Sequence, residues 1–253
     1  DGVLFKTRRG ELTLDIHEIT LLTKSIRPLP DKWSGLKDSE IRYRQRYLDL
    51  ISNDDSLNIA IKRSKIISSV RNFMNKKGFL EVETPVLVDI PAGGRAIPFE
   101  TFHESLEKKL FLRIATELHL KKLIVGGIEK VYEIGRLFRN EGIDHDHNPE
   151  FTTMESYESF EDYNTVMIMV ENLVSSVAKE VNGTTKIKIS EDDYIDLEPP
   201  WERLDLRESI ITNTGIDFLK YKSSKDLASV MIDKGFVADP KEAWGILLDR
   251  LIS

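Results

Sequence analysis

Residues 138–155 read FRNEGIDHDHNPEFTTME and place an arginine, two histidines, several carboxylates and an aromatic ring within eighteen positions. The segments around this stretch, residues 130–138 and 151–160, are rich in β-branched, aromatic and large aliphatic side chains. Between them, Gly142 and the pair Asn148-Pro149 interrupt that pattern, as turn residues do. The sequence therefore predicts two strands joined by a hairpin turn.

The alternation of side chains along a strand predicts which of these residues share a face. Phe151, Glu155 and Tyr157 have the same parity and should point the same way, beside Arg139 from the partner strand. Charged residues on a hairpin usually form a solvated face, and one Arg–Glu pair there contributes little. The length of the motif and its unusual order of residue types favour a small-molecule site over that simpler interpretation.

The stretch closely resembles motif 2 of the class II aminoacyl-tRNA synthetases, in the form used by the lysyl-tRNA synthetase family. Four further segments match that family in order and spacing: residues 42–50 (RYRQRYLDL), 78–85 (GFLEVETP, similar to motif 1), 112–118 (LRIATEL) and 123–127 (LIVGG). The matching segments run from about Lys24 to about Trp244, so the resemblance covers nearly the whole chain.

The resemblance implies an α+β fold, an antiparallel sheet flanked by helices, preceded by the tail of an OB-fold. Residues 1–26 would be the end of the anticodon-binding OB-fold, 27–53 a linker, and 54–253 a partial catalytic domain with motifs 1 and 2 but without motif 3. The chain starts inside a turn-and-strand pattern without Met, and its last apolar segment stops without a cap. We therefore expect a fragment truncated at both ends, with little or no activity alone.

Apolar periodicity and capping signals predict the other elements. Ser39 is expected to cap a helix over 38–50, Gly78 to end one over 58–77, and Asp162 to begin one over 162–181. Further predictions are a turn at 7–11, a half-buried strand at 12–19, a linker marked by Pro28, Pro30 and Gly35, helices at 116–125, 206–215, 224–235 and 244–252, and a second hairpin at 186–197. The resemblance implies that helix 58–77 and the strand after it form a homodimer interface.

The composition is that of an ordinary globular protein of 253 residues, with 40% hydrophobic and 31% charged residues. The absence of cysteine excludes disulfides and thiol nucleophiles. No apolar run approaches the ~20 residues that cross a bilayer, and no signal-peptide pattern is present, so we expect no membrane partner and a cytoplasmic location. A formal net charge of −7 argues weakly against a general nucleic-acid binder but leaves tRNA binding through local patches open.

The reaction implied by the resemblance is activation of lysine by ATP, followed by transfer of the lysyl group to tRNA. Two anions must meet in the first step, so fixed cations matter more than proton transfer. Arg139 would bridge the lysine carboxylate and the α-phosphate, and Phe151 would stack on adenine. The other ATP contacts implied are Glu141, His147 and Asn148, although a histidine in a loop could equally make only a local bond.

Lysine recognition requires negative groups at two distances. Glu117 is expected at the α-ammonium with the carbonyl of Gly93, and Glu155 and Tyr157 at the side-chain ammonium, while Arg139 holds the carboxylate. Without the resemblance, Glu117 would pass for a helix-surface carboxylate and Tyr157 for a half-buried strand aromatic.

A metal site within the chain is not expected. The run His145-Asp146-His147 has an odd ligand spacing and no cysteine support. The acidic Mg²⁺ ligands of the resembled family, one lysine-reading carboxylate and an adenine-stacking arginine would lie beyond Ser253.

Two departures from the family pattern stand out. Ile97 occupies a position where an arginine usually precedes Pro98-Phe99, with Arg95 nearby, and Asp146 puts a carboxylate into a loop that should approach triphosphate. Two other hypotheses stay open at this point: a non-catalytic dimerising or binding module, and a paralogue that lysylates a protein. The OB-like segment at 2–23 argues against the paralogue.

Overall fold

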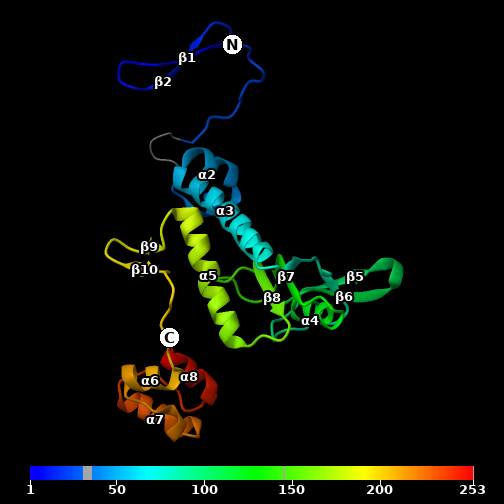
Figure 1. The fold of residues 1–253 in the computed structure, drawn as a ribbon, viewed down its shortest axis with the longest axis vertical. Helices are drawn as coiled ribbons and strands as arrows, with labels where there is room; N and C mark the ends of the chain where they lie inside the picture. The colour runs from blue at the N-terminus through cyan, green and yellow to red at the C-terminus, as the bar shows by residue number, and fades with distance from the viewer. Residues whose placement is uncertain (31–35, 145, 253) are drawn as a thin grey trace. The chain divides into compact units, whose positions relative to one another are not determined.

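The computed structural model describes residues 1–30, 36–144 and 146–252 and is drawn in Figure 1. It divides into two compact units, Asp1–Leu80 and Glu81–Ser253. Helices occur together with small antiparallel sheets in this structure, which confirms the predicted α+β class. Within the described residues, no helix is both long and apolar enough to cross a lipid bilayer.

The first unit begins with a hairpin of β1 (Gly2–Lys6) and β2 (Leu12–Ile16). The predicted turn over 7–11 is confirmed, because Gly10 has φ +84° and the Gly10 N–H donates to the Thr7 carbonyl at 2.9 Å. The predicted half-burial of the second strand is wrong. Leu12, Leu14 and Ile16 are 69%, 48% and 55% exposed, since nothing in the described residues covers this two-stranded ribbon.

Three helices follow: α1 (Ser39–Arg44), α2 (Arg46–Ser52) and α3 (Asp54–Lys76). The expected cap Ser39 is wrong by one residue, because the Asp38 carboxylate accepts the Ile41 N–H at 3.1 Å. The single helix expected over 38–50 is also interrupted at Gln45, whose φ of −118° is not helical. Of the linker residues named above, Gly35 lies outside the described part of the chain.

The break between α1 and α2 is held by Asp49, which is fully buried. Its carboxylate accepts hydrogen bonds from Arg42 Nε at 2.7 Å, from Arg46 at 2.6 Å and from Asn53 at 2.5 Å. Burial raises the pKa of Asp49, but these donors outweigh it and hold the pKa below its usual range. Two of the three arginines in the resembled segment, Arg42 and Arg46, thus stabilise the junction between α1 and α2.

Helix α3 ends as predicted, with Gly78 in the left-handed conformation at φ +83°. Several of its apolar side chains are more exposed to solvent than those of an amphipathic helix packed against a core. Ile59 and Ile66, seven residues apart on one face of the helix, are 68% and 42% exposed and form an uncovered apolar stripe. Leu57 and Ile61 are exposed on another face.

The centre of the second unit is the antiparallel pair β7 (Lys130–Phe138) and β8 (Glu150–Glu158). Its register runs from Lys130 opposite Glu158 to Phe138 opposite Glu150, which confirms the predicted hairpin. With β3 (Leu80–Glu81) it forms a sheet of order β3-β7-β8, in which β8 is an edge strand. The fully buried Val131 and Tyr132 of β7 anchor the sheet in the core.

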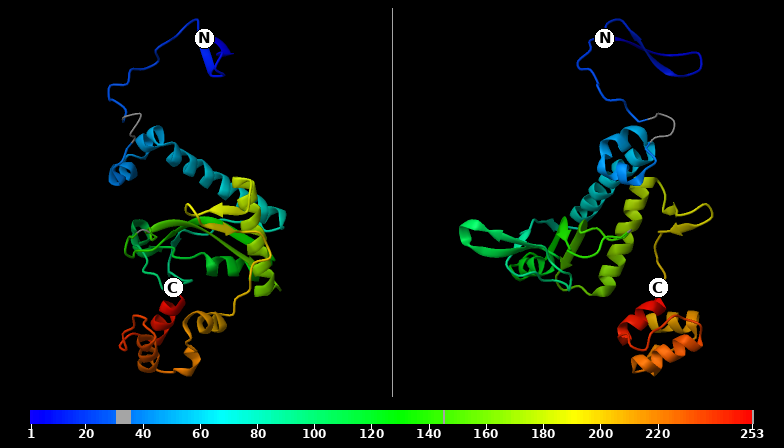
Figure 2. Two further views of the ribbon diagram at one scale, coloured as in Figure 1. Left: turned by 90° about the vertical axis from the view of Figure 1, so that its left-hand side faces the viewer. Right: turned by 180° about the vertical axis from the view of Figure 1, so that it is seen from behind.

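Helix α4 (Glu117–Val125) and a second, three-stranded sheet neighbour this pair (Figures 1 and 2). Helix α4 packs against both β7 and β8, with Leu120 completely buried. A second sheet has the order β4-β6-β5 and consists of β4 (Leu87–Val88), β5 (Glu100–His103) and β6 (Lys108–Leu112), with a short 3₁₀ turn, η1 (Glu104–Leu106), before β6.

The remaining elements confirm the other helix predictions within a residue or two. Helix α5 (Tyr163–Asn182) is capped by Asp162 as expected, and β9 (Lys186–Lys188) pairs with β10 (Tyr194–Asp196). The last part comprises α6 (Leu206–Thr214), the 3₁₀ turn η2 (Phe218–Lys220), α7 (Ser224–Asp233) and α8 (Trp244–Ile252). These helices share a hydrophobic core of their own around Leu227, Met231 and Leu247.

Candidate active site

The β7–β8 register brings the side chains of the central motif onto one face. Leu137 lies opposite Phe151, and Glu133 opposite Glu155. Beyond the last pair, the Arg139 N–H donates to the Pro149 carbonyl at 2.8 Å, so the ladder continues into the turn. The guanidinium of Arg139 lies 5.2 Å from the ring centroid of Phe151. The aromatic and the arginine are therefore direct neighbours, as the alternation predicts.

A cavity of about 240 Å³ opens at this end of the hairpin. Its lining residues are Arg139, Glu141, Gly142, Asp146, His147, Asn148 and Phe151, which include all five residues assigned to ATP from the sequence. Small-molecule sites usually measure roughly 300–1,000 Å³. The cavity by itself therefore accommodates part of a nucleotide.

Arg139 carries an unused donor at this cavity. Its Nε atom is buried and has no hydrogen-bond partner among the described residues. A buried unpaired donor costs roughly 1–3 kcal/mol, and more when it is charged, unless an acceptor arrives. The Arg139 side chain is thus arranged to gain from an anionic or carbonyl oxygen.

The hairpin loop is organised by Asp144. Its carboxylate accepts the N–H groups of Asp146 and His147 at 2.8 Å and contacts the His147 ring Nδ1 at 2.8 Å. The backbone N–H of Asp146 and the His147 ring lower the pKa of Asp144. The bond to Asp144 in turn raises the pKa of His147, which favours its cationic form. The local bond considered for this histidine is present, but its acceptor is a carboxylate; His145 lies outside the described residues.

A second cluster lies where α4 meets β8. Glu117 is the first residue of α4, and the Thr116 N–H before it donates to the Glu155 carboxylate at 3.2 Å. The Tyr157 hydroxyl donates to the other Glu155 oxygen at 3.4 Å. Burial, followed by the charges of Glu155 and Glu117, raises the pKa of Tyr157 to about 12. The phenol therefore stays protonated and able to donate at neutral pH.

Gly93 closes this cluster from the loop that follows β4. Its φ is +91°, and a Cβ atom at this position would lie 2.7 Å from the Ala115 Cβ and 3.2 Å from the Glu117 Cβ. Only glycine fits both this backbone conformation and this close approach. The four lysine-binding candidates that lie away from the turn, Gly93, Glu117, Glu155 and Tyr157, are thus brought together.

Lys121, one helical turn after Glu117, also enters this cluster. Its Nζ lies 2.6 Å from Glu117 Oε1 and 5.5 Å from the centroid of the Tyr157 ring. Glu117 and Tyr157, both expected to bind an ammonium group of lysine, therefore contact the ammonium group of Lys121.

The sequence is also similar to that of known proteins. The family model for "tRNA synthetases class II (D, K and N)" matches residues 38–237, which is most of the chain. The chain belongs to this family. It is 51% identical over 252 residues to a lysine–tRNA ligase of Dehalococcoides mccartyi and 50% identical over 250 residues to those of Staphylococcus aureus strains Mu3 and N315. These matches cover 99–100% of the chain and 50% of each relative, so the chain spans about half the length of the curated relatives it matches.

In this class II synthetase chain, a buried ion pair supports the site face, and the sequence interpretation missed it. Arg113 and Glu133 are 3% exposed each and pair with one another. Glu133 also accepts the Thr84 hydroxyl at 2.6 Å, and Arg113 Nε donates to the Arg136 carbonyl at 3.0 Å. Gly135 was the available signal, because a glycine inside a strand often marks a close approach. A Cβ atom there would lie 2.3 Å from an Arg113 nitrogen.

The unusual Ile97 docks onto the hairpin loop through its backbone. Its N–H donates to Glu141 Oε1 at 3.3 Å, and its carbonyl accepts the Asn140 N–H at 2.7 Å. The Ile97 side chain is 58% exposed and takes no part in these bonds. The substitution therefore leaves the junction between this loop and the turn intact.

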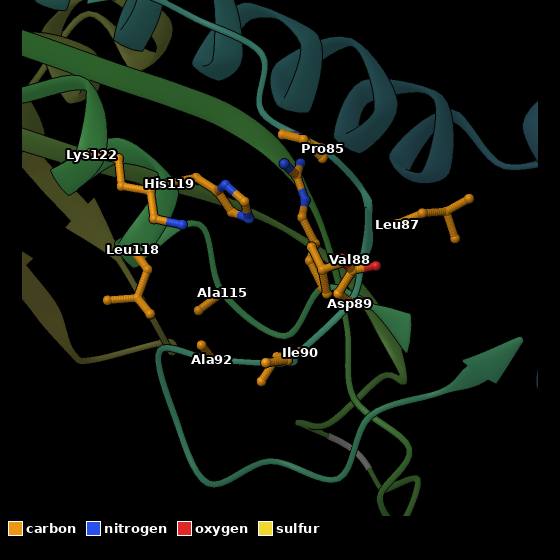
Figure 3. Close-up of a pocket in the computed structure, with 11 residues that line it drawn as sticks. Pro85, Leu87, Val88, Asp89, Ile90, Ala92, Ala115, Leu118, His119 and Lys122 are labelled. Carbon is orange, nitrogen blue, oxygen red and sulfur yellow. The ribbon is translucent and has the colours of Figure 1, made fainter. Parts of the chain in front are cut away.

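A larger cavity of about 480 Å³ lies between α4 and the segment 85–92 (Figure 3). It is lined by Pro85, Leu87, Val88, Asp89, Ile90, Ala92, Arg113, Ala115, Leu118, His119 and Lys122. None of the site residues named from the sequence lines it, and most of its lining is apolar. This larger cavity therefore does not coincide with the residues of the central motif. Among the described residues, no three His, Asp or Glu side chains converge as a metal site would require.

Proposed function

We propose that this chain is part of a lysine–tRNA ligase, which activates lysine with ATP to lysyl-adenylate and transfers the lysyl group to the 3′ end of tRNA. The observation that carries the proposal is the pair of clusters on the β7–β8 hairpin. One joins Arg139 to Phe151 in a cavity with four further polar residues, and the other joins Glu117, Glu155 and Tyr157. The similarity to curated lysine–tRNA ligases supports lysine as the amino acid.

In the proposed first step, an oxygen of the lysine carboxylate attacks the α-phosphorus of ATP, and the bond to pyrophosphate breaks. Charge accumulates on the phosphoryl oxygens, so a fixed cation close to them lowers the barrier. Arg139 supplies that cation, since its planar guanidinium can bridge two anions. Its Nε has no hydrogen-bond partner among the described residues and can donate to the substrate. Asp144 raises the pKa of His147, which in its protonated form would add positive charge at the phosphates.

The spacing along β8 suits a ligand that carries adenine at one end and an ammonium at the other. Phe151 and Tyr157 are six residues apart on the same face, which corresponds to roughly 20 Å. Phe151 would stack on adenine at one end of this face. Glu155 and the protonated Tyr157 would bind the side-chain ammonium of lysine at the other end.

Glu117 and the Gly93 carbonyl would bind the α-ammonium, and Arg139 the carboxylate. Because the guanidinium covers one face of the Phe151 ring, adenine can stack on that face only after Arg139 moves.

The partners belong to the same proposal. The exposed stripe of α3 supports a homodimer through the motif 1 region, and tRNA charging implies a cytoplasmic location. Residues 1–26 would end an anticodon-binding OB-fold, 27–53 a linker, and 54–253 a partial catalytic domain. Mg²⁺ would accompany ATP, but the described residues offer no acidic cluster for it, so no step is assigned to a metal here.

ATP–pyrophosphate exchange by the complete protein, measured with each amino acid in turn, tests the proposed function. We expect exchange with lysine and background rates with aspartate and asparagine. Exchange with either of these two but not with lysine would move the protein to another branch of the D, K and N family.

The exposed stripe of α3 also favours a second candidate, a dimerising or binding module without catalysis. Exchange by the complete protein separates the two candidates. The module hypothesis expects a dimer in analytical ultracentrifugation and no exchange with any amino acid, and lysine-dependent exchange by the complete protein would refute it.

A further inference from the structure

Lys121 places an ammonium of the chain in the region proposed for a substrate ammonium. Its Nζ lies 2.6 Å from Glu117 Oε1, and it also lies 5.5 Å from the Tyr157 ring centroid. An ordinary surface pair between residues four apart involves one helix only. Here the ammonium also contacts an aromatic ring from β8, so it is held between two elements.

The chemistry of this contact is the chemistry expected for the substrate. Lysine carries two primary ammonium groups, and a carboxylate and an electron-rich ring are the partners that bind such a cation. Lys121 holds Glu117 Oε1, so a substrate α-ammonium that uses both Glu117 oxygens must displace it. The Lys121 side chain is 52% exposed on a long flexible stem, so it can turn into solvent without disturbing the core.

We propose that Lys121 is a built-in competitor for the α-ammonium subsite, displaced from Glu117 when substrate lysine binds. This inference rests on the proposed function, because it requires Glu117 to bind the substrate. Lys121 neutralises and orients the Glu117 carboxylate in the free protein. A ligand without an α-ammonium group would not displace Lys121 from Glu117.

The decisive variants change Lys121 and its neighbour on the same helix. Lys121→Met removes the charge and keeps most of the stem, whereas Lys121→Arg keeps a cation. Lys122→Met is the matched control, since Lys122 lines the larger cavity instead. Lysine-dependent ATP–pyrophosphate exchange is measured for each in the complete protein.

We expect Lys121→Met to lower the KM for lysine roughly two- to fivefold, the range that exposed ion pairs and cation–π pairs supply. The KM for ATP should stay the same, and Lys121→Arg and Lys122→Met should keep the KM of the wild type for lysine. An unchanged or raised KM for lysine in Lys121→Met would overturn the inference, because Lys121 would then be a plain surface residue or a substrate ligand.

A second measurement locates the competition. 6-Aminohexanoic acid is lysine without its α-amino group, so its inhibition constant should change less than the KM for lysine does in Lys121→Met. An inhibition constant that falls as far as the KM for lysine would mean that Lys121 acts through general charge, which refutes the assignment to the α-ammonium subsite. Failure of the proposed function looks different, since the wild type would then show no lysine-dependent exchange at all.

Discussion

The two ends of the β7–β8 hairpin are built in different ways. At the turn, three of the five residues proposed for ATP, Glu141, His147 and Asn148, lie on an exposed loop that hydrogen bonds from Asp144 and the backbone of Ile97 hold in place. At the other end, the residues proposed for lysine rest on a helix and a strand over the buried pair Arg113–Glu133. A loop can adjust to a nucleotide, whereas discrimination among amino acids requires groups that do not move. The difference predicts that damage at the two ends will have different signatures.

The largest effect is expected at the buried pair. Arg113→Met leaves the Glu133 charge buried without its partner, which should lower the free energy of unfolding by about 3–5 kcal/mol in urea denaturation. Arg136→Met is the control, because the Arg136–Glu150 pair is more than half exposed and should contribute less than about 1 kcal/mol. Equal losses in both variants would show that the pair supports nothing. The double variant Arg113→Met/Glu133→Met should regain part of the stability.

At the turn, the expected loss is in catalysis and not in folding. Arg139→Lys keeps the charge but loses the planar fork, so kcat for lysine-dependent exchange in the complete protein should fall roughly 10²–10³-fold. The same change at Arg136, which lies on the opposite face of β7 by alternation, should leave kcat within about twofold of the wild type. A small effect at Arg139 would remove it from the reacting phosphate.

A smaller and more selective effect is expected at Gly93. In Gly93→Ala the new methyl group meets Ala115 and Glu117 in a left-handed conformation, a strain of order 1–3 kcal/mol. The KM for lysine should rise about tenfold while the KM for ATP stays unchanged. Gly94→Ala is matched, since its Cβ atom would meet nothing within 4 Å. A rise in the KM for ATP as well would mean that the rigid end and the adaptable end are not separate.

The smallest effect concerns protonation in the loop. His147 should titrate above its ordinary value of 6.5, and Asp144→Asn should bring its pKa back toward that value. Because the pKa of this histidine is raised on folding, the pair stabilises the loop fully below about pH 6.5 and loses its contribution as pH rises through the pKa of the folded form. NMR titration of the imidazole checks this prediction, and identical titration in both proteins would contradict it.

Local signals were enough to predict many elements from the sequence. Residues 130–138 were predicted as a strand to the residue, and Asp162 as the cap of α5, because strand composition and capping depend on near neighbours. The cap of α1 at Asp38 was missed because two adjacent polar residues could both cap the helix. The break at Gln45 was missed because the buried Asp49 that holds it interacts with residues on both sides.

The site was predicted as a set of residues but not as an arrangement. Parity on β8 was sufficient to place Phe151, Glu155 and Tyr157 on one face. Arg113 and Glu133, which pair beneath the site, lie twenty residues apart in the sequence, and no periodicity in the sequence links them. The position of Lys121 over the Tyr157 ring likewise depends on how α4 packs on β8, which only the folded chain defines.

The edge position of β8 bears on how the protein behaves in a test tube. In the part of the chain described here, one side of this nine-residue strand has no strand beside it, and such an edge can recruit another molecule and start aggregation. Charged side chains line the strand, which opposes pairing with another copy: Glu155 on one face, and on the other Glu150 and Glu158, which pair with Arg136 and Lys130. Glu155, the carboxylate of β8 proposed to bind a ligand cation, thus also helps to keep this edge from pairing with another copy.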